Sequence, residues 1–189
     1  MKKEGRLFIL SAPSGCGKTT LSKYLVKSKS GIIQSISTTT RNPRRGEIDG
    51  KDYFFVSEKE FKSTISKKGF LEWTKNFGFF YGTPKKFILN NIKKGRNVLL
   101  SIDVKGALKV KRLYPQAVSI FILPPSMEDL KKRRNNRMTD SSGEIKRRLK
   151  IAKKEISYLD KYDYKVINDN LGKAKDELKA IITAERHKI

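Results

Sequence analysis

A stretch near the N-terminus carries residue types that bind phosphate. Residues 11–20 read SAPSGCGKTT, which has the spacing of the GxxxxGK[ST] phosphate-binding loop except that Ala12 stands where the first glycine is usual. Gly15 and Gly17 lack a Cβ atom, so the backbone N–H groups can turn inward around phosphate oxygens at the start of a helix, where the helix dipole favours anions. The stretch therefore predicts a site for the phosphates of a nucleotide.

The residues at the end of this loop have separate chemical roles. Lys18 supplies a positive charge to the phosphates, and Thr19 offers a hydroxyl ligand to Mg²⁺. Cys16 lies inside the loop with no histidine near it in the sequence, which favours a small packing residue, although a helix end can also activate a thiol. The only histidine, His187, lies close to the C-terminus, and we expect no catalytic role for it.

A second basic stretch suggests a second phosphate site. Residues 38–51 read TTTRNPRRGEIDGK, where Arg41 and Arg44 lie three residues apart beside hydroxyl groups. Arginine forks and hydroxyls suit a phosphate dianion, but a basic solvated loop fits the same residues equally well. The polar composition, rich in Pro and Gly, predicts that this loop is exposed. Further along, Glu72 taken alone is only an acidic residue in an aromatic-rich strand.

Apolar runs and helical patterns alternate along the chain. The runs that read as strands lie at residues 6–12, 32–37, 97–103, 117–123 and 162–169. Between the second and third of them, strand-like runs surround a helix that Ser57 and Glu60 open as a capping box. This alternation predicts an α/β fold with a parallel, doubly wound sheet, a small α/β insertion, and binding loops at the carboxyl ends of the strands.

Length and composition limit the class of protein. The chain of 189 residues suits one compact unit, and 43 Lys and Arg against 19 Asp and Glu give a net charge of +24, which favours anionic partners. The single cysteine excludes an intrachain disulfide, and no apolar run approaches the length of a membrane span or of a signal-peptide core. We therefore expect a cytoplasmic protein that contacts no membrane and is a monomer or a homodimer.

Short motifs, in their order along the chain, resemble those of guanylate kinases. They are SAPSGCGK, STTTRNPRRGE, GKDYFFV, FLEW, YGTP, SIDVKGA, ILPPS and VINDN. The resemblance covers nearly the whole chain and implies the P-loop nucleoside monophosphate kinase fold. It implies a core of residues 1–36, 84–125 and 157–189, a GMP-binding insertion at 37–83 and a helical lid at 126–156. The implied reaction is reversible phosphoryl transfer from ATP to GMP, with dGMP as a second acceptor and Mg²⁺ as cofactor.

The resemblance also implies nucleotide-binding roles for particular residues. The ATP-binding positions are Ala12, Pro13, Ser14, Gly15, Cys16, Gly17, Lys18, Thr19, Thr20 and Asn168. The GMP-binding positions are Ser37, Arg41, Arg44, Tyr53, Glu72, Tyr81, Thr83 and Asp103. Guanine presents N1–H and N2–H₂ donors to the carboxylates, while the hydroxyls of Ser37 and Thr83 can donate to O6. Adenine presents a bare N1 acceptor to Glu72, so the same site should reject AMP.

The basic stretch at residues 131–154 resembles the lid of that family. It contains 11 Lys or Arg and two acidic residues, and taken alone it reads as a solvated or nucleic-acid-binding helical face. With the resemblance, its arginines would approach the transferring phosphoryl group together with Lys18 when the lid closes. The matching catalytic arginines are Arg133, Arg137 and Arg148, and the adjacent alternatives are Arg134 and Arg147.

One residue departs from the family pattern. Members commonly have Asp-x-Asp where this chain has Ser101, Ile102 and Asp103, so the first carboxylate is missing and the affinity for Mg²⁺ should be lower if that group orients the metal through water. Asn168 matches a position near adenine, and a turn or cap asparagine is an equal interpretation. Two other classes stay open, a guanylate-kinase-like binding module and a basic nucleic-acid-binding protein. The glycine loop with Lys18 argues against the first, and the absence of a nucleic-acid motif against the second, so no specific nucleic-acid partner is expected.

Overall fold

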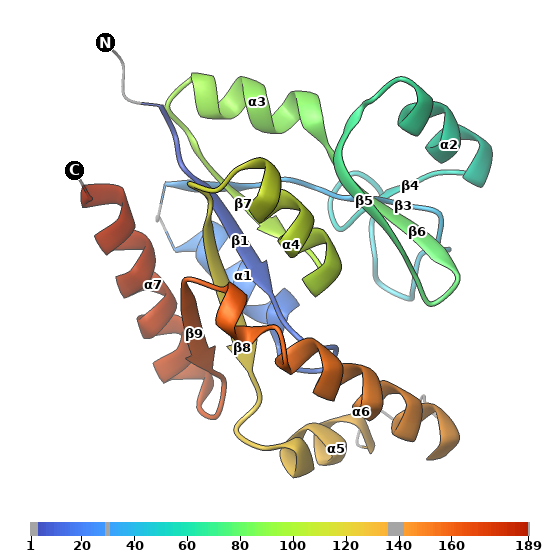
Figure 1. Cartoon of the computed structure of the whole chain (residues 1–189), viewed down its shortest axis with the longest axis vertical. Coiled ribbons are helices and arrows are strands. Elements are labelled where there is room, and N and C mark those ends of the chain that lie inside the picture. Colours follow the sequence, from blue (N-terminus) through green and yellow to red (C-terminus); the bar gives the residue numbers. More distant parts are fainter. Residues whose placement is uncertain (1–3, 29–30, 136–141, 189) are drawn as a thin grey trace.

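The main apolar runs form one parallel sheet. The structure is a computed structural model that describes residues 4–28, 31–135 and 142–188 (Figure 1). The larger sheet has the strand order β2-β7-β1-β8-β9, and every neighbouring pair is parallel. Its strands are β1 (Leu7–Ser11), β2 (Ile32–Gln34), β7 (Asn97–Ser101), β8 (Val118–Leu123) and β9 (Tyr164–Ile167). The predicted α/β class with a parallel sheet is confirmed.

The side chains of these strands alternate between two apolar cores. Phe8 and Leu10 pack on one face of the sheet, and Leu7 and Ile9 pack on the other, because successive side chains of a strand point in opposite directions. The helices over the first core include α1 (Lys18–Lys27) and α7 (Leu171–His187), and those over the second are α3 (Lys85–Lys93) and α4 (Val104–Leu113) (Figure 1). Helices on both faces make the sheet doubly wound, as predicted.

A smaller mixed sheet forms the insertion. Its strand order is β4-β3-β6-β5, with β3 and β4 parallel and the other pairs antiparallel. Its elements are β3 (Thr38–Thr39), β4 (Phe54–Phe55), α2 (Glu58–Ser66), β5 (Phe70–Asn76) and β6 (Phe79–Pro84). The predicted capping box of Ser57 and Glu60 opens α2, and Phe61 of this helix stacks on Phe80 with ring centroids 5.3 Å apart. The helix therefore packs on the sheet of the insertion.

The stretch predicted as an exposed polar loop is partly buried. Thr38 and Thr39 form strand β3, and Arg41 is also buried, whereas residues 42–46 are exposed. The Thr39 hydroxyl donates to the carbonyl of Phe80 at 2.9 Å. Local composition could not show this anchoring to a strand far along the chain, so the prediction was wrong for the first part of the stretch.

Strands β1 and β7 are neighbours whose following helices lie on opposite faces of the sheet. Leu10 pairs with Ser101 in register, and the N–H of Ile102 donates to the carbonyl of Leu10 at 3.2 Å. The loops after β1 and β7 therefore both leave the sheet at the carboxyl ends of its strands. This is the topological switch point, where open α/β sheets bind their ligands.

Two helices, α5 and α6, extend from one end of the core (Figure 1). Their bounds are Met127–Asn135 and Ser142–Ile156, and a short 3-10 turn at Leu159–Lys161 leads from α6 to β9. The hydroxyl of Ser126 caps α5, because it accepts from the N–H of Asp129 at 3.0 Å. Ala152 of α6 is buried in the first core, which fixes the end of this helix nearest the sheet.

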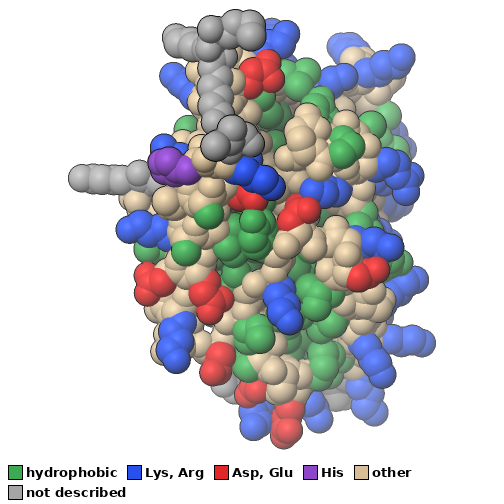
Figure 2. All heavy atoms as spheres, turned by 60° about the vertical axis from the view of Figure 1, so that its left-hand side comes forward, with side chains coloured by type: hydrophobic (Ala, Val, Ile, Leu, Met, Phe, Trp, Pro, Cys, Tyr) green, Lys and Arg blue, Asp and Glu red, His purple; other side chains and the backbone are tan. Residues whose placement is uncertain are grey.

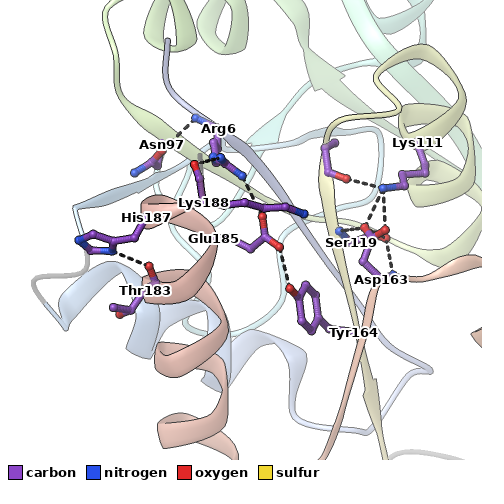
Figure 3. A network of polar contacts seen from close by, with 11 residues as sticks. Arg6, Asn97, Lys111, Ser119, Asp163, Tyr164, Thr183, Glu185, His187 and Lys188 are labelled. Atoms are coloured by element: carbon purple, nitrogen blue, oxygen red, sulfur yellow. Dashed lines mark hydrogen bonds and ion pairs between the residues drawn. The ribbon is translucent and has the colours of Figure 1, made fainter. Parts of the chain in front are cut away.

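A buried carboxylate holds the C-terminal helix on the sheet (Figure 3). Glu185 accepts hydrogen bonds from Arg6 Nη1 at 2.8 Å and from the Tyr164 hydroxyl at 2.6 Å. His187 contacts only the surface of its own helix in this view, with Nδ1 2.8 Å from the carbonyl oxygen of Thr183. Arg6 and Tyr164 lie at the amino ends of their strands, so this network stabilises the fold at the end opposite the switch point.

The surface is strongly basic without being uniformly so. On the face drawn in Figure 2, Lys and Arg side chains lie around much of the outline and are interspersed with acidic ones, while apolar side chains lie toward its middle. This face does not gather its charge into one stripe. Within the described residues, no helix is both long enough and apolar enough to cross a membrane.

Candidate active site

The phosphate loop lies between β1 and α1 at the switch point. Gly15 and Gly17 have φ values of 104° and 86°, in the left-handed region that side chains disfavour. A Cβ atom at Gly17 would lie 2.4 Å from Nδ2 of Asn168, and this amide donates to the carbonyl of Cys16 at 2.9 Å. Asn168 thus holds the loop from behind, and both the backbone angle and the close amide require glycine at position 17.

The remaining residues of the loop differ in exposure. The buried ones are Ala12, Pro13 and Cys16, and the exposed ones are Ser14, Thr19 and Thr20. Cys16 lies in the first apolar core, which agrees with its interpretation as a packing residue. The side chain of Thr19 is on the first turn of α1 and open to solvent.

Lys18 reaches across the switch point to the end of β7. Its Nζ donates to the hydroxyl of Ser101 at 3.0 Å. Burial lowers the pKa of Lys18 to about 8, and the negative charges of Asp103 and Glu155 oppose this shift only in part. The ammonium is therefore short of compensating negative charge, a deficit that bound phosphates would remove.

Glu155 is a charged residue of the site that no sequence motif indicates. It lies near the end of α6, where burial raises the pKa of its carboxyl to about 7, Asp103 adds to the shift, and Lys105 and Lys18 oppose it. It enters the site because α6 returns to the sheet, a tertiary relationship with no local signal.

A second group of side chains surrounds Glu72. Its Oε1 accepts a hydrogen bond from the Thr83 hydroxyl at 2.6 Å, across the β5–β6 pair. A Cβ atom at Gly106 would lie 2.8 Å from Oε2 of Glu72 and 3.3 Å from Oδ1 of Asp103, so both carboxylates lie over the bare backbone of that glycine. Burial raises the pKa of Glu72 to about 7, and the charge of Asp103 adds to this effect.

The hydroxyl of Thr83 is not arranged as the sequence suggested. It carries one proton, which it donates to Glu72, and it therefore has none for O6 of a base in this arrangement. The hydroxyl of Ser37, half-buried just before β3, is the other predicted donor. The guanine contacts predicted for Ser37 and Thr83 stay predictions.

Two residues beside Glu72 were missed in the sequence. Thr74 and Asn76 donate to Oδ2 of Asp103 at 3.1 and 3.4 Å, and Oδ1 of Asp103 caps α4 by accepting from the N–H of Gly106 at 2.8 Å. Residues 72, 74 and 76 are every second residue of β5, so the period of two in a strand could have placed them on one face from the sequence alone. The strand therefore presents a polar row to the loop after β7.

The basic loop brings its arginines together through a glutamate. Nη2 of Arg41 donates to both oxygens of Glu47 at 3.0 and 2.9 Å, and the backbone N–H of Arg44 donates to Glu47 at 2.7 Å. The guanidinium of Arg41 lies 5.5 Å from the ring centroid of Tyr53, whose ring is 6.1 Å from that of Tyr81. Four of the predicted GMP-binding residues are thus neighbours, and Glu47, which accepts from Arg41 and Arg44, was missed in the sequence.

An ion pair connects the basic loop with the phosphate-loop helix. Nζ of Lys23, on α1, lies 2.7 Å from Oδ1 of Asp52, which directly precedes Tyr53. The segment that leads into Tyr53 therefore lies beside the helix that begins at Lys18.

The described arginines of the predicted lid point in different directions. Nη2 of Arg133 donates to the carbonyl of Asn168 at 2.8 Å, beside the phosphate loop, whereas Nε of Arg148 donates to Glu144 at 2.6 Å. Arg147, one of the alternatives, also binds Glu144, at 2.9 Å, and its side chain is 61% exposed. Arg137 lies outside the described residues.

Known proteins match the chain over its whole length. The family profile described as guanylate kinase matches residues 4–185. The chain belongs to the guanylate kinase family. It is 50% identical over 189 residues to the guanylate kinase of Caldanaerobacter subterraneus subsp. tengcongensis, which covers 100% of this chain and 92% of the relative. The guanylate kinase of Clostridium acetobutylicum is 48% identical over 189 residues, with 100% and 90% covered.

A solved structure shows the same fold. The crystal structure of guanylate kinase from Anaplasma phagocytophilum superposes with a TM-score of 0.83 at 39% identity, covering 99% of this chain and 89% of that one. The P-loop nucleoside monophosphate kinase fold implied by the sequence motifs is therefore confirmed, and the resemblance to guanylate kinases is confirmed as membership of their family.

The donor set near Thr19 suits Mg²⁺ that arrives with a nucleotide. Among the residues that the structure describes, no group of three or more His, Cys, Asp or Glu could hold a metal ion alone. Mg²⁺ is usually held by one or two protein oxygens together with substrate phosphates and waters. The exposed hydroxyl of Thr19, directly after Lys18, fits that pattern.

Proposed function

We propose that this protein transfers the γ-phosphoryl group of ATP to GMP reversibly, with dGMP as a second acceptor. The observation that carries the proposal is Oε2 of Glu72, which is buried and has no hydrogen-bond partner within the described part of the chain. A buried acceptor without a donor costs about 1–3 kcal/mol. The N1–H and N2–H₂ groups of guanine are donors that would satisfy it, and the names of the relatives support the same substrate.

The residues divide between two nucleotides. The phosphate loop with Lys18 and Thr19 would hold the phosphates of ATP, and Asn168 supports that loop from behind. The insertion, residues 37–83, would hold GMP, with Arg41 and Arg44 at its phosphate, while residues 126–156 would form the lid. The Lys23–Asp52 ion pair supports this arrangement, because it joins the helix after the phosphate loop to the residue that precedes Tyr53.

The chemistry needs no general base. The second pKa of a phosphate monoester is about 6, so an oxygen of GMP is already anionic near neutral pH. The barrier comes from bringing two polyanions together and from the charge on the moving phosphoryl group. Lys18, the N–H groups of the loop, Arg133 and Arg148 would stabilise that charge. Mg²⁺, when bound through Thr19, would supply further neutralisation of the ATP phosphates.

Charge and thiol chemistry suit the setting of this reaction. A net charge of +24 attracts anionic nucleotides and raises their local concentration. The only cysteine is a buried thiol in the core, which suits a reducing compartment. We place the reaction in the cytoplasm.

A coupled assay tests the proposal directly. GMP, dGMP, AMP, UMP and CMP are offered in turn with ATP and Mg²⁺, and ADP formation is measured. We expect rapid turnover of GMP, slower turnover of dGMP and little with the others. AMP turnover equal to that of GMP would contradict the role of Glu72, and no turnover with any acceptor would contradict the proposed reaction.

A further inference from the structure

The two-residue turn between β5 and β6 carries an aromatic residue. Phe77 has a φ of 50°, in the left-handed region that bulky residues rarely adopt, and Gly78 follows with a φ of 87°. Because Asn76 and Phe79 pair across the hairpin, Phe77 and Gly78 form its two-residue turn, and positive φ at both positions is the type I′ geometry that such turns favour. Phe77 is half-buried although it lies at the end of a hairpin, which means that another part of the chain covers its ring.

The lid helix α6 provides that cover. The guanidinium carbon of Arg148 lies 4.9 Å from the centroid of the Phe77 ring, and that of Arg147 lies at 5.6 Å. Guanidinium groups at such distances are attracted to the ring. Residues far apart in sequence therefore join the insertion to the lid.

Arg148 is held from a second side by its own helix. Its Nε donates to Oε1 of Glu144 at 2.6 Å, one helical turn earlier, and its side chain is 21% exposed. The ring and the carboxylate together restrict a side chain that would otherwise have many rotamers. Arg147 binds the same glutamate, but its side chain is 61% exposed. Of the two arginines, Arg148 therefore has the ring contact that is better shielded from solvent.

The hairpin that carries Phe77 also carries the proposed base-reading residues. Glu72, Thr74 and Asn76 lie along β5, and Asn76 directly precedes Phe77. The ring position therefore depends on the strand that contacts Asp103 and the base site. We propose that Phe77 is a positioning residue that sets the guanidinium of Arg148 for phosphoryl transfer, so that GMP on β5 and the lid arginine are coupled through one aromatic contact. This inference rests on the proposed function.

Three variants separate the ring contact from general structure. Phe77→Leu keeps the apolar bulk but removes the π face, Phe77→Tyr keeps the face, and Phe79→Leu is the matched control on the same hairpin, where Phe79 is 40% exposed. We expect Phe77→Leu to lower kcat roughly 3- to 20-fold, with KM for GMP changed by less than about 2-fold. We expect Phe77→Tyr and Phe79→Leu each to have a kcat close to that of the wild type.

Binding is measured apart from turnover. Titration calorimetry measures the dissociation constant for GMP in each variant without depending on turnover. An unchanged dissociation constant for GMP beside a lowered kcat supports positioning. The proposal is overturned if Phe77→Leu matches Phe79→Leu in kcat, or if it weakens GMP binding and leaves kcat intact.

A double-mutant cycle tests the contact without any enzyme assay. Unfolding is measured by chemical denaturation for wild type, Phe77→Leu, Arg148→Met and the double variant. Coupling between the two changes supports the contact, and strict additivity overturns the proposal even if GMP turnover is normal. An inactive wild type with clear coupling would instead refute the proposed reaction and, with it, the role of Phe77 in transfer, while the contact itself would stand.

Discussion

The ammonium of Lys18 donates to the hydroxyl of Ser101 across 3.0 Å, from the helix after β1 to the end of β7. A serine offers an acceptor but no negative charge, so burial prevails and the pKa of Lys18 falls to about 8. The free protein thus keeps a poorly compensated cation where the phosphates of ATP would bind. The buried charge makes the free protein less stable, and bound phosphates would remove this unfavourable term.

Replacing Lys18 by methionine should separate activity from stability. We expect turnover to fall by orders of magnitude, because the phosphates lose their fixed cation. At neutral pH the midpoint of thermal unfolding should rise by about 2–6 °C, because a buried charge is removed.

The pH dependence of stability checks the cause. The pKa of Lys18 is about 8 in the folded protein against 10.5, so wild-type stability should rise as pH increases from about 8 to 10.5 and the lysine loses its charge in both states. Lys18→Met should lack this rise. Lys27→Met, in the last turn of the same helix, is the control and should change neither property.

Introducing the missing carboxylate should change the metal response. Ser101→Asp places a negative charge beside the Lys18 ammonium, which raises the pKa of Lys18. The new carboxylate can also accept hydrogen bonds from water molecules bound to Mg²⁺. We expect half-maximal turnover at a lower Mg²⁺ concentration, and Ser101→Ala serves as the neutral comparison. Identical Mg²⁺ titrations for Asp, Ser and Ala at this position would show that the first carboxylate of the family pattern plays no part in metal handling here.

Glu72→Gln should weaken the choice between GMP and AMP. The amide keeps the shape of the side chain and can still accept from Thr83, but it can no longer accept both guanine donors. We expect the ratio of kcat/KM for GMP over AMP to fall by about 10- to 100-fold. Glu58→Gln, on the exposed face of α2, is the control, and a ratio that stays constant in Glu72→Gln would remove this residue from base recognition.

The same variant should alter the pH dependence of folding. Burial raises the pKa of Glu72 from 4.5 to about 7, so the folded protein holds a proton that the unfolded chain releases, and stability declines as pH rises between these values. The decline attributable to Glu72 is on the order of 3 kcal/mol. Denaturation across this range should show a flatter profile in Glu72→Gln, and parallel profiles would contradict the assignment.

Local patterns explain why some parts of this site could be predicted and others could not. The phosphate loop was predictable because Gly15, Gly17 and Lys18 lie within a few residues and their spacing has a direct chemical meaning. The burial of Thr38 and Thr39 depends on pairing with β6, and the approach of Glu155 depends on where α6 returns to the sheet. Neither relationship leaves a pattern in the neighbouring sequence.

Glu47 joins the two arginines that are predicted to bind the phosphate of GMP. Its carboxylate accepts two bonds from Arg41 and one from the backbone of Arg44, with side-chain exposures of 10% for Arg41 and 20% for Glu47. In Glu47→Gln the loop loses a charge-assisted pair, so the arginine would spend less time in the binding arrangement. We expect KM for GMP to rise about 5- to 20-fold with kcat within about 2-fold.

The direction of that change decides between two roles for Glu47. If the carboxylate organises the arginines, its loss weakens GMP binding and leaves the chemical step intact, because the phosphoryl group is stabilised elsewhere. If it instead occupies the position of the GMP phosphate, its loss removes a competitor and KM for GMP falls. Steady-state kinetics of Glu47→Gln with GMP varied at saturating ATP distinguish the two, and Glu58→Gln controls for the loss of one negative charge on the insertion. A fall in KM would overturn the organising role.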